Sequence, residues 1–464
     1  MRAQAAAWGI LAVSCSDLQQ ATLDADGSTV GATVSASADG VVVSESSDST
    51  AASTHSDDTG GGTAVTTTVS DSSSTGGTSL GISDSSSDSS SDSSSTAGTE
   101  TTTGDTGAEQ PSCGTPQTLC HGPAVTVDPQ CGAPRSAGVG DFDNDGNLDV
   151  VVACEDSDNV VIMLGDGMGG LAIGSTIGTG AESRPAEVIV LDLDNDGNAD
   201  VATANRDGHS VTVLYGFGNG VVGNLVEHDT SDRTQGLAAG DLDGNGYLDI
   251  VAAVRDQHGI SIFRDDAMGG LTSEIEVEDD TSRRPESVFL AQLDDQPGLD
   301  AAWASEQDDR IVIHFGDGAG ALGAPTTLTA EGSPSQISGG DFDGDGDIDL
   351  VVANRDDDTI SYYQSNGNGT FAGQVVTGVG DQPNWLTVAD VDNDGALDIL
   401  TADQGHGTVT VLLGSGDGLF IAATPLDVGG AVYAVTTGDL NGDEIPDIIA
   451  VEASTLRLML STPG

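Results

Sequence analysis

The chain has 464 residues, a formal net charge of -63 and twelve basic residues, all of them arginine. This balance excludes nucleic acid and anionic membrane surfaces as favoured partners, because both are bound through basic patches. The sequence contains no apolar run of the ~18 residues that a membrane-spanning helix needs, so it predicts no such helix.

Residues 1–15 have the pattern of an export signal, in which Arg2 precedes a mostly apolar stretch. The run Leu11-Ala-Val-Ser-Cys15 resembles a bacterial lipoprotein cleavage box, with Ala12 where leucine is usual. The resemblance implies a lipid on Cys15. The alternatives are secretion without a lipid and an incorrectly assigned first residue. We therefore expect an exported protein, either a cell-surface lipoprotein or a secreted one, that meets a membrane through Cys15 alone.

Residues 16–112 are dominated by Ser, Thr, Gly and Asp and contain no aromatic residue. Such a segment buries too little apolar surface to offset the entropy of ordering it. We expect a disordered low-complexity linker that acts as a spacer.

From Cys113 onward a nine-residue loop recurs. In its first copy carboxylates stand at positions 1, 3, 5 and 9, and Gly146 stands at position 6. Carboxylates ~4 Å apart near a protein surface repel one another by about 4 kcal/mol per pair, so the loop predicts a central cation. Oxygen ligands around a glycine turn are typical of calcium. The copies begin every 49 or 51 residues, at Asp141, Asp192, Asp241, Gln292, Asp341, Asp390 and Asp439.

Each repeat also predicts four short strands. In the second repeat, strands are expected at residues 187–191, 201–204 and 211–215, followed by a Gly-rich turn and a more polar fourth strand. Four strands in ~50 residues match one propeller blade. The last repeat lacks a fourth strand, and residues 124–128 stand where a fourth strand precedes every other repeat. The sequence thus predicts an all-β, seven-bladed β-propeller over residues 113–464, closed by residues 124–128 against the last blade.

Two runs resemble the repeat of FG-GAP and VCBS proteins, namely Gly140-Asp-Phe-Asp-Asn-Asp-Gly-Asn-Leu-Asp-Val-Val-Val-Ala153 and Gly367 to Phe371. That family includes the integrin alpha-subunit propeller. The resemblance spans residues 118–464 and implies calcium in the loops. An EF-hand is excluded because position 12 of the first loop is Val152 rather than glutamate, and a nonapeptide β-roll is excluded because the period is wrong.

Five loops are expected to hold calcium. The last loop, which starts at Asp439, is a weaker candidate because Glu444 replaces the glycine. The loop starting at Gln292 keeps two carboxylates and has Pro297 at position 6, so we expect no metal there. The expected ligands are Asp141, Asp143, Asp145, Asp149, Asp192, Asp194, Asp196, Asp200, Asp241, Asp243, Asn245, Asp249, Asp341, Asp343, Asp345, Asp349, Asp390, Asp392, Asp394 and Asp398, with Asp439, Asn441, Asp443 and Asp447 in the weaker loop.

Four further cysteines follow Cys15, and an exported protein favours disulfides. Cys131 precedes the first strand of the first blade and Cys154 ends its second strand. Neighbouring antiparallel strands bring these positions together, so we expect Cys131–Cys154 and, by remainder, Cys113–Cys120.

A blade meander places the carboxylate loops on one face of the ring and the turns between second and third strands on the other. The integrin resemblance implies that this second face is an interaction surface. Arg206, Arg255 and Arg355 occupy one repeat position there, and each either contacts a ligand or pairs with the aspartate that follows it. The same face gathers His209, His258, His406, Arg184, Arg233, Arg283, Arg284 and Trp385.

No P-loop or HExxH motif is present, so we expect a non-enzymatic interaction or adhesion module, monomeric, with an unknown protein or glycan ligand. The alternatives are a carbohydrate-binding propeller, since some members of that family bind sugars between blades, and a hydrolase or polysaccharide lyase that uses aspartate pairs with calcium.

Overall fold

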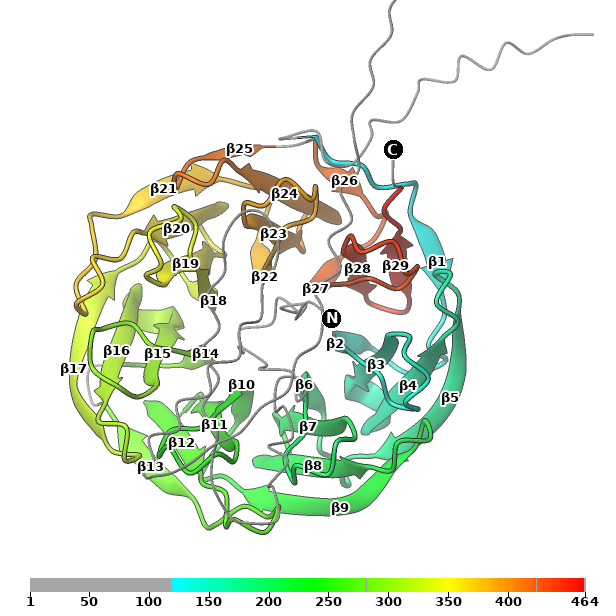
Figure 1. The fold of residues 1–464 in the computed structure, drawn as a ribbon, viewed down its shortest axis with the longest axis horizontal. Coiled ribbons are helices and arrows are strands. Elements are labelled where there is room, and N and C mark those ends of the chain that lie inside the picture. The colour runs from blue at the N-terminus through cyan, green and yellow to red at the C-terminus, as the bar shows by residue number, and fades with distance from the viewer. Residues whose placement is uncertain (1–117, 257, 280–281, 423, 463–464) are drawn as a thin grey trace, which may run out of the picture. The chain divides into compact units, whose positions relative to one another are not determined.

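A computed structural model describes residues 118–256, 258–279, 282–422 and 424–462. Seven antiparallel sheets are arranged in a ring around a central axis, each sheet forming one blade (Figure 1). The fold class predicted from the repeats is confirmed. The predictions for residues 1–112, including the signal, the lipid site and the spacer, lie outside the described residues.

Each blade runs from an inner strand at the axis to an outer strand at the rim. The first three blades consist of β2 (Pro134–Gly140), β3 (Asp149–Cys154), β4 (Asn159–Gly165) and β5 (Leu171–Gly178); of β6 (Pro185–Leu191), β7 (Asp200–Asn205), β8 (Ser210–Gly216) and β9 (Val222–Asp229); and of β10 (Thr234–Gly240), β11 (Asp249–Val254), β12 (Gly259–Phe263) and β13 (Ile275–Glu278). Two 3-10 turns follow second strands, η1 (Glu155–Ser157) in blade 1 and η2 (Glu306–Asp308) in blade 4.

Blades 4 to 6 repeat the order. They consist of β14 (Pro285–Ala291), β15 (Asp300–Ser305), β16 (Arg310–Gly316) and β17 (Leu322–Thr329); of β18 (Pro334–Gly340), β19 (Asp349–Asn354), β20 (Thr359–Tyr363) and β21 (Val375–Gly378); and of β22 (Pro383–Ala389), β23 (Asp398–Asp403), β24 (Thr408–Gly414), β25 (Phe420–Ala422) and β26 (Leu426–Asp427). In blade 6 both β25 and β26 pair with β24.

Blade 7 closes the ring with strands from both ends of the described chain. It consists of β27 (Val432–Gly438), β28 (Asp447–Glu452) and β29 (Leu456–Met459), and β1 (Val125–Val127) pairs antiparallel with β29. Thr126 lies opposite Arg457 in this register. The predicted closure by residues 124–128 is confirmed, and it removes the open edge that blade 7 would otherwise present.

The apolar core is divided among the blade interfaces. Seven hydrophobic clusters each join two neighbouring blades, and the second strand of every blade is buried along its whole length. A strand that is buried on both faces reads as a continuous apolar run, as in Val150 to Ala153. The face-to-face packing of blades therefore holds the ring together.

A disulfide joins Cys131 to Cys154, whose Cα atoms are 5.9 Å apart, and this predicted pairing is confirmed. Cys120 is also disulfide-bonded. Its predicted partner Cys113 lies outside the described residues. Within the part of the chain that the structure describes, no helix is long and apolar enough to cross a membrane.

Candidate metal centres

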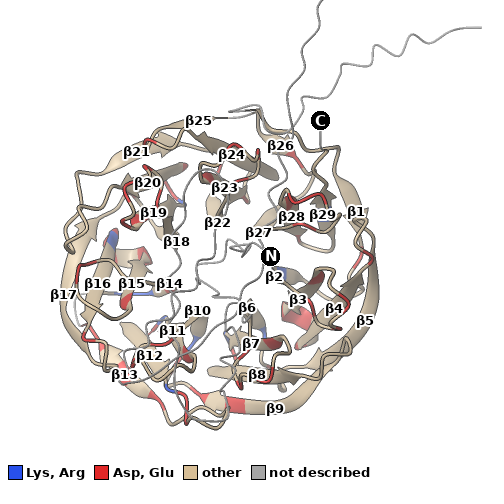
Figure 2. Ribbon diagram, viewed as in Figure 1, with Lys and Arg blue, Asp and Glu red and all other residues tan. Residues whose placement is uncertain are grey.

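The carboxylate loops lie on one face of the ring because each follows an inner strand and precedes a second strand. Figure 2 shows ribbon segments of acidic residues, in red, recurring from blade to blade around the ring. In blade 1 the loop joins Gly140, the last residue of β2, to Asp149, the first residue of β3. Its glycine, Gly146, has a φ of 90°, a conformation that glycine adopts without the steric cost met by other residues.

Backbone hydrogen bonds shape the loop around its first aspartate. Asp141 accepts a hydrogen bond from the N–H of Asp145 at 3.1 Å and another from the N–H of Gly146 at 2.9 Å. Asp143 accepts a longer one, 3.2 Å, from the same Asp145 N–H. Aspartates at positions 1 and 3 therefore hold the turn and face the same point.

Five loops bring three carboxylates together, with ligand oxygens all within 4.8 Å of one another. These groups are Asp141, Asp143 and Asp149; Asp192, Asp194 and Asp200; Asp241, Asp243 and Asp249; Asp341, Asp343 and Asp345; and Asp390, Asp392 and Asp398. The five loops are the ones predicted to hold calcium. The remaining position-5 side chains, Asp145, Asp196, Asn245 and Asp394, lie outside the groups. Each caps the turn by accepting from the N–H two residues onward.

The blade 5 loop differs from the others in its ninth residue. Asp349 accepts a hydrogen bond from the Tyr362 hydroxyl at 2.8 Å and is not part of the carboxylate group there. Asp345 takes its place beside Asp341 and Asp343. The tyrosine on β20 thus diverts a predicted ligand, and nothing in the loop sequence signals that contact.

The ninth aspartate has a second role that the sequence does not reveal. Asp149 accepts hydrogen bonds from the N–H groups of Phe142, at 2.8 Å, and Gly165, at 2.7 Å. It therefore fastens the start of the loop to the end of the third strand. The same pair of contacts is made in all seven blades, by Asp149, Asp200, Asp249, Asp300, Asp349, Asp398 and Asp447.

Convergence of buried carboxylates makes their ionisation costly. Burial is the main cause that raises the pKa values of the ninth aspartates, and the charges of the first and third aspartates raise them further. Backbone hydrogen bonds lower these pKa values in part. The resulting pKa is about 6 for Asp149, about 7 for Asp200 and about 8 for Asp398. A divalent cation bound at the group would replace this mutual repulsion by attraction. The donor set of five loops therefore fits a hard cation.

Two loops do not form a carboxylate group among the described residues. In blade 4, Gln292 turns its side-chain amide onto the Gln296 carbonyl, at 3.1 Å, in place of a metal ligand. In blade 7, the Ser461 hydroxyl lies 2.8 Å from Asp443 and 2.9 Å from Asp447, between the two expected ligands. Glu444 has a φ of 70°, the strained value anticipated at this position.

A model of the FG-GAP-like repeat matches residues 141–203, 192–252, 298–352, 341–401 and 390–450. These segments together span more than half of the chain. The chain belongs to the FG-GAP-like repeat family. The matches to the FG-GAP-like repeat omit residues 253–297, which include the first six of the nine residues of the divergent blade 4 loop. No curated protein matches the chain.

Solved structures share the propeller fold with this FG-GAP-like chain. BBS1N, solved in complex with ARL6DN, is 14% identical with a TM-score of 0.52, over 74% of this chain and 97% of BBS1N. The virginiamycin B lyase of Staphylococcus aureus is 12% identical with a TM-score of 0.52, over 73% of this chain and 99% of the lyase. An Agrocybe aegerita lectin that recognises non-reducing terminal N-acetylglucosamine is 19% identical over 73% of this chain and 86% of its own, with a TM-score of 0.47. At these identities the likeness to BBS1N and to the lyase shows the fold alone.

On the face opposite the loops, the arginines predicted to contact a ligand or an adjacent aspartate are held mainly by glutamates of neighbouring blades. Arg206 pairs with Glu155 of blade 1, while its contact with Asp207 is 3.8 Å long. Arg355 pairs with Glu306 of blade 4, while its contact with Asp356 is 4.0 Å long. Pairing with the adjacent aspartate is thus present for these two arginines but secondary.

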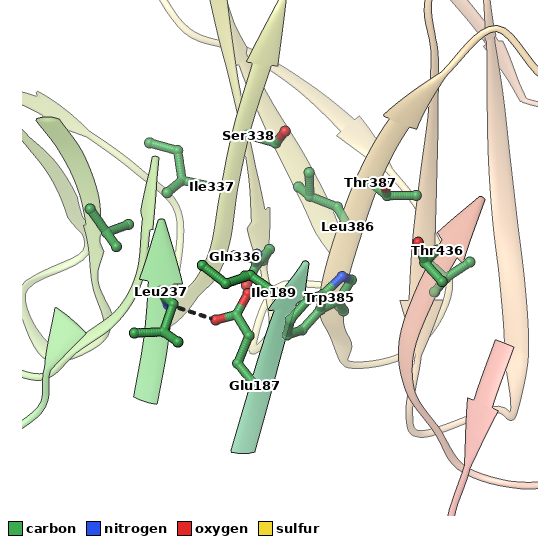
Figure 3. Close-up of a pocket in the computed structure, with 12 residues that line it drawn as sticks. Glu187, Ile189, Leu237, Gln336, Ile337, Ser338, Trp385, Leu386, Thr387 and Thr436 are labelled. Atoms are coloured by element: carbon green, nitrogen blue, oxygen red, sulfur yellow. Dashed lines mark hydrogen bonds between the residues drawn. The ribbon is translucent and has the colours of Figure 1, made fainter. Parts of the chain in front are cut away.

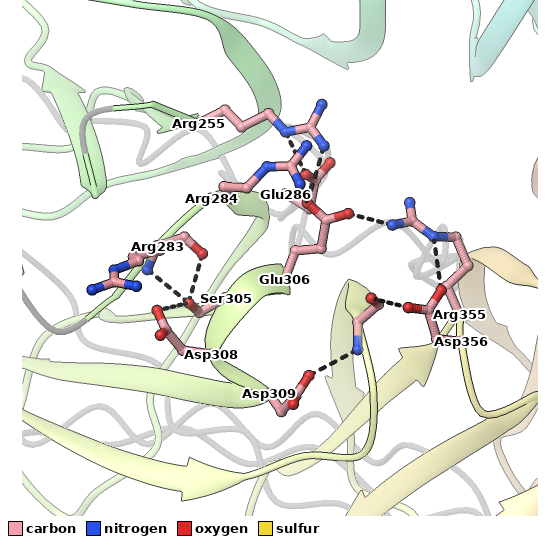
Figure 4. Close-up of polar contacts among 11 residues, drawn as sticks. Arg255, Arg283, Arg284, Glu286, Ser305, Glu306, Asp308, Asp309, Arg355 and Asp356 are labelled. Atoms are coloured by element: carbon pink, nitrogen blue, oxygen red, sulfur yellow. Dashed lines mark hydrogen bonds and ion pairs between the residues drawn. The ribbon is translucent and has the colours of Figure 1, made fainter.

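Glu306 is the centre of a cluster that joins three blades (Figure 4). It is 7% exposed and lies 3.0 Å from both Arg255 and Arg284, in addition to Arg355. Burial opposes its ionisation, but hydrogen bonds from Glu286 and the arginines hold the pKa of Glu306 well below its usual range. Arg255 also lies 2.7 Å from Glu286.

Glu155 forms the matching cluster in blade 1, with Arg135 at 2.7 Å and Arg184 at 2.6 Å. Glu155 and Glu306 occupy the same repeat position as Arg206, Arg255 and Arg355, directly after the second strand. Superimposing the repeats in the sequence would have identified these glutamates as partners. Other residues predicted on this face, His209, His406, Arg233 and Arg283, are exposed turn residues, and His258 is half-buried in its turn.

Proposed function

We propose that this FG-GAP-like propeller is a calcium-stabilised, non-enzymatic interaction module that acts at the cell surface or after secretion. The observation that carries the proposal is the convergence of three carboxylates in each of five loops on one face. Calcium takes six to eight oxygen ligands in flexible geometry, which suits loops that combine carboxylates with backbone carbonyls. A bound ion would supply charge neutralisation and hold each turn.

The experiment compares thermal unfolding in calcium and in excess chelator. Ligand binding to the folded state alone stabilises it by mass action, so we expect the melting temperature to fall in chelator. Asp141→Asn should remove one of five bound ions, measured by metal analysis after dialysis against calcium. The matched control is Asp294→Asn in the blade 4 loop, which should leave five ions. Identical melting curves in calcium and chelator would refute calcium stabilisation.

Interaction is proposed for the face that carries the turns between second and third strands. A pull-down from native surface extract, with and without calcium, tests this part of the proposal. Recovery of the same partner by wild-type protein in calcium, and its loss in chelator, is the expected result. Recognition of a glycan is the second candidate, and the half-buried Trp385 in the polar axial channel favours it.

Export and anchoring are proposed from the sequence of residues 1–15. Acyl labelling should mark the wild-type protein, and Cys15→Ala should abolish the label and release the protein into the medium. Release without any loss of label would contradict attachment through Cys15. We propose that the propeller is monomeric, which light scattering of residues 113–464 tests.

A further inference from the structure

Every inner strand contains a β-bulge at its second residue. In β2, Pro134 pairs with Cys154 and Ser136 pairs with the next residue, Ala153, so that Arg135 is the extra residue. The same shift occurs in the inner strands of all seven blades. Bulges redirect a side chain and are frequent beside functional sites.

The seven bulged residues meet at the mouth of the axial channel, on the face opposite the carboxylate loops. Together with Gln336 and Trp385 they line one cavity: Arg135, Ala186, Gln235, Glu286, Ser335, Asn384 and Tyr433. The backbone is repeated seven times, but these seven side chains are all different. The repeated backbone therefore presents a non-repeating set of side chains at this mouth.

The charged members of this ring are already neutralised. Arg135 lies 2.7 Å from Glu155 and 4.4 Å from the centre of the Tyr433 ring. Glu286 lies 2.7 Å from Arg255. The mouth therefore offers no uncompensated charge to a ligand, and an ionic ligand would have to break these pairs.

A second cavity continues inward along the channel and shares Gln336 and Trp385 with the first. Its wall includes Glu187 and Thr436, and Figure 3 shows Glu187, Gln336 and Trp385 converging from β6, β18 and β22. Glu187 is 5% exposed and accepts a hydrogen bond from the Leu237 N–H at 2.9 Å. Burial raises the pKa of Glu187 to about 8, which favours the neutral, protonated carboxyl at neutral pH.

Two buried polar atoms in these walls have no hydrogen-bond partner among the described residues. They are Oε1 of Gln235 in the outer cavity and Oγ1 of Thr436, which is 3% exposed, in the inner one. Leaving such an atom unpaired is costly, so a site of this kind is completed by water or by a ligand. The half-buried Trp385 lines both cavities and adds an aromatic ring to their walls.

We propose that this axial chamber binds a small, uncharged, hydroxyl-rich molecule, with a single pyranose unit as the defining case. A hydroxyl group both donates and accepts hydrogen bonds, so hydroxyl groups can complete the hydrogen bonding of Gln235, Thr436 and Glu187. A group that only donates or only accepts cannot do this for all three. The apolar face of the sugar ring would lie on Trp385. This inference deepens the proposed function, on which it rests, by naming the ligand class of the interaction module.

The size of the chamber limits what enters it. The outer and inner cavities measure about 40 and 30 Å³. At roughly 10–15 Å³ for each water, each cavity holds about two to four waters that a ligand would displace. The chamber therefore takes one edge of a single ring, and the rest of a longer glycan would project from the mouth past Tyr433.

The test titrates methyl pyranosides and glycerol into the full protein and follows Trp fluorescence and ligand NMR signals. We expect saturable binding by at least one pyranoside, insensitive to salt because no ion pair forms. Thr436→Val should weaken binding at least tenfold, and Trp385→Phe should do the same. Because the Thr436 hydroxyl is unpaired, Thr436→Val should leave the melting temperature unchanged or raise it. Trp303→Phe, in the blade 4 core, is the control and should leave binding unchanged.

Absence of binding by the whole panel at millimolar concentration, or equal binding by wild type and both chamber variants, would overturn the proposal and leave the cavities as water sites. Repeating the titration in calcium and in chelator separates this result from the calcium proposal. Binding that depends on Thr436, combined with chelator-insensitive melting, would refute calcium stabilisation alone. A protein partner that binds the chamber variants and the wild-type protein equally would support the proposed interaction module and would contradict ligand binding in the axial chamber.

Discussion

Asp300 accepts a hydrogen bond from the backbone N–H of Gly316 at 2.7 Å, which ties the start of the second strand of blade 4 to the end of the third. It also accepts from the Leu293 N–H at 2.6 Å. The loop around it has lost the carboxylates at positions 1 and 5, yet the ninth aspartate is retained with both contacts. The ninth position therefore fastens the blade whether or not the loop holds a cation.

Asp300→Asn should lower the free energy of unfolding by about 1–3 kcal/mol, because its amide NH2 would face a buried N–H donor. The loss should be the same in calcium and in chelator, as measured by urea unfolding. Asp294→Asn, six residues earlier in the same loop, is the control and should change stability by less than about 0.5 kcal/mol. A loss for Asp300→Asn that appears in calcium alone would show that the aspartate acts through a metal.

Glu444→Gly should stabilise the protein by about 0.5–1 kcal/mol, because Glu444 has a φ of 70° and glycine adopts this conformation at lower cost. The number of bound calcium ions should stay at that of the wild type, since the Ser461 hydroxyl already lies between Asp443 and Asp447. Thermal unfolding and metal analysis of the same preparation check both statements. An additional bound ion would show that the glycine position, and not Ser461, decides occupancy.

The fold was predictable because its determinants are local and repeated. Carboxylate spacing within nine residues predicts the turn, apolar runs such as Val150 to Ala153 predict the buried second strand, and the period places seven copies in a ring. The closing strand followed from counting strands at the two ends. Even the disulfide Cys131–Cys154 followed from strand adjacency within one blade.

The features that the sequence did not predict depend on contacts between residues about 50 positions apart or on the register of strand pairing. The alternation of apolar and polar residues along a strand does not encode either of them. The bulge at Arg135 shifts the pairing by one residue without changing the apolar pattern. The pairing of Arg355 with Glu306 depends on how two blades face each other. Tyr362 reaches a loop aspartate across its own blade, and its sequence position alone does not indicate this.

Glu306→Gln should destabilise the ring by roughly 2–3 kcal/mol, because three arginines would lose the buried carboxylate that they share. Fully buried pairs lose about 3–5 kcal/mol when broken. Here the loss is smaller because the Arg284 side chain is 41% exposed and can be hydrated. Asp356→Asn, which removes the long secondary contact of Arg355, should cost less than about 0.5 kcal/mol. Chemical unfolding of the two variants in parallel checks the order, and equal losses would contradict it.

Glu187→Gln should make the protein less sensitive to alkaline pH. Burial raises the pKa of Glu187 to about 8 in the folded protein, above its ordinary value of 4.5. The folded state therefore binds a proton that the unfolded state releases, and the stability associated with this proton is present below pH ~4.5 and is lost as pH rises through 8. A Gln at this position can still accept from the Leu237 N–H and has no charge to bury. The free energy of unfolding of wild type minus that of Glu187→Gln should fall by about 1.4 kcal/mol per pH unit between the two pKa values.

The difference between these two proteins isolates Glu187, because the buried loop aspartates titrate in both. Urea unfolding from pH 5 to pH 9 provides the measurement, with Glu276→Gln on the exposed outer strand β13 as the control. The control should run parallel to wild type over the whole range. A pyranoside hydroxyl that accepts a hydrogen bond from the protonated Glu187 carboxyl should hold the carboxyl neutral to higher pH, so with saturating ligand the difference between wild type and Glu187→Gln should continue to fall above pH 8. A wild-type curve parallel to that of Glu187→Gln without ligand would show that the carboxyl is ionised in the folded protein.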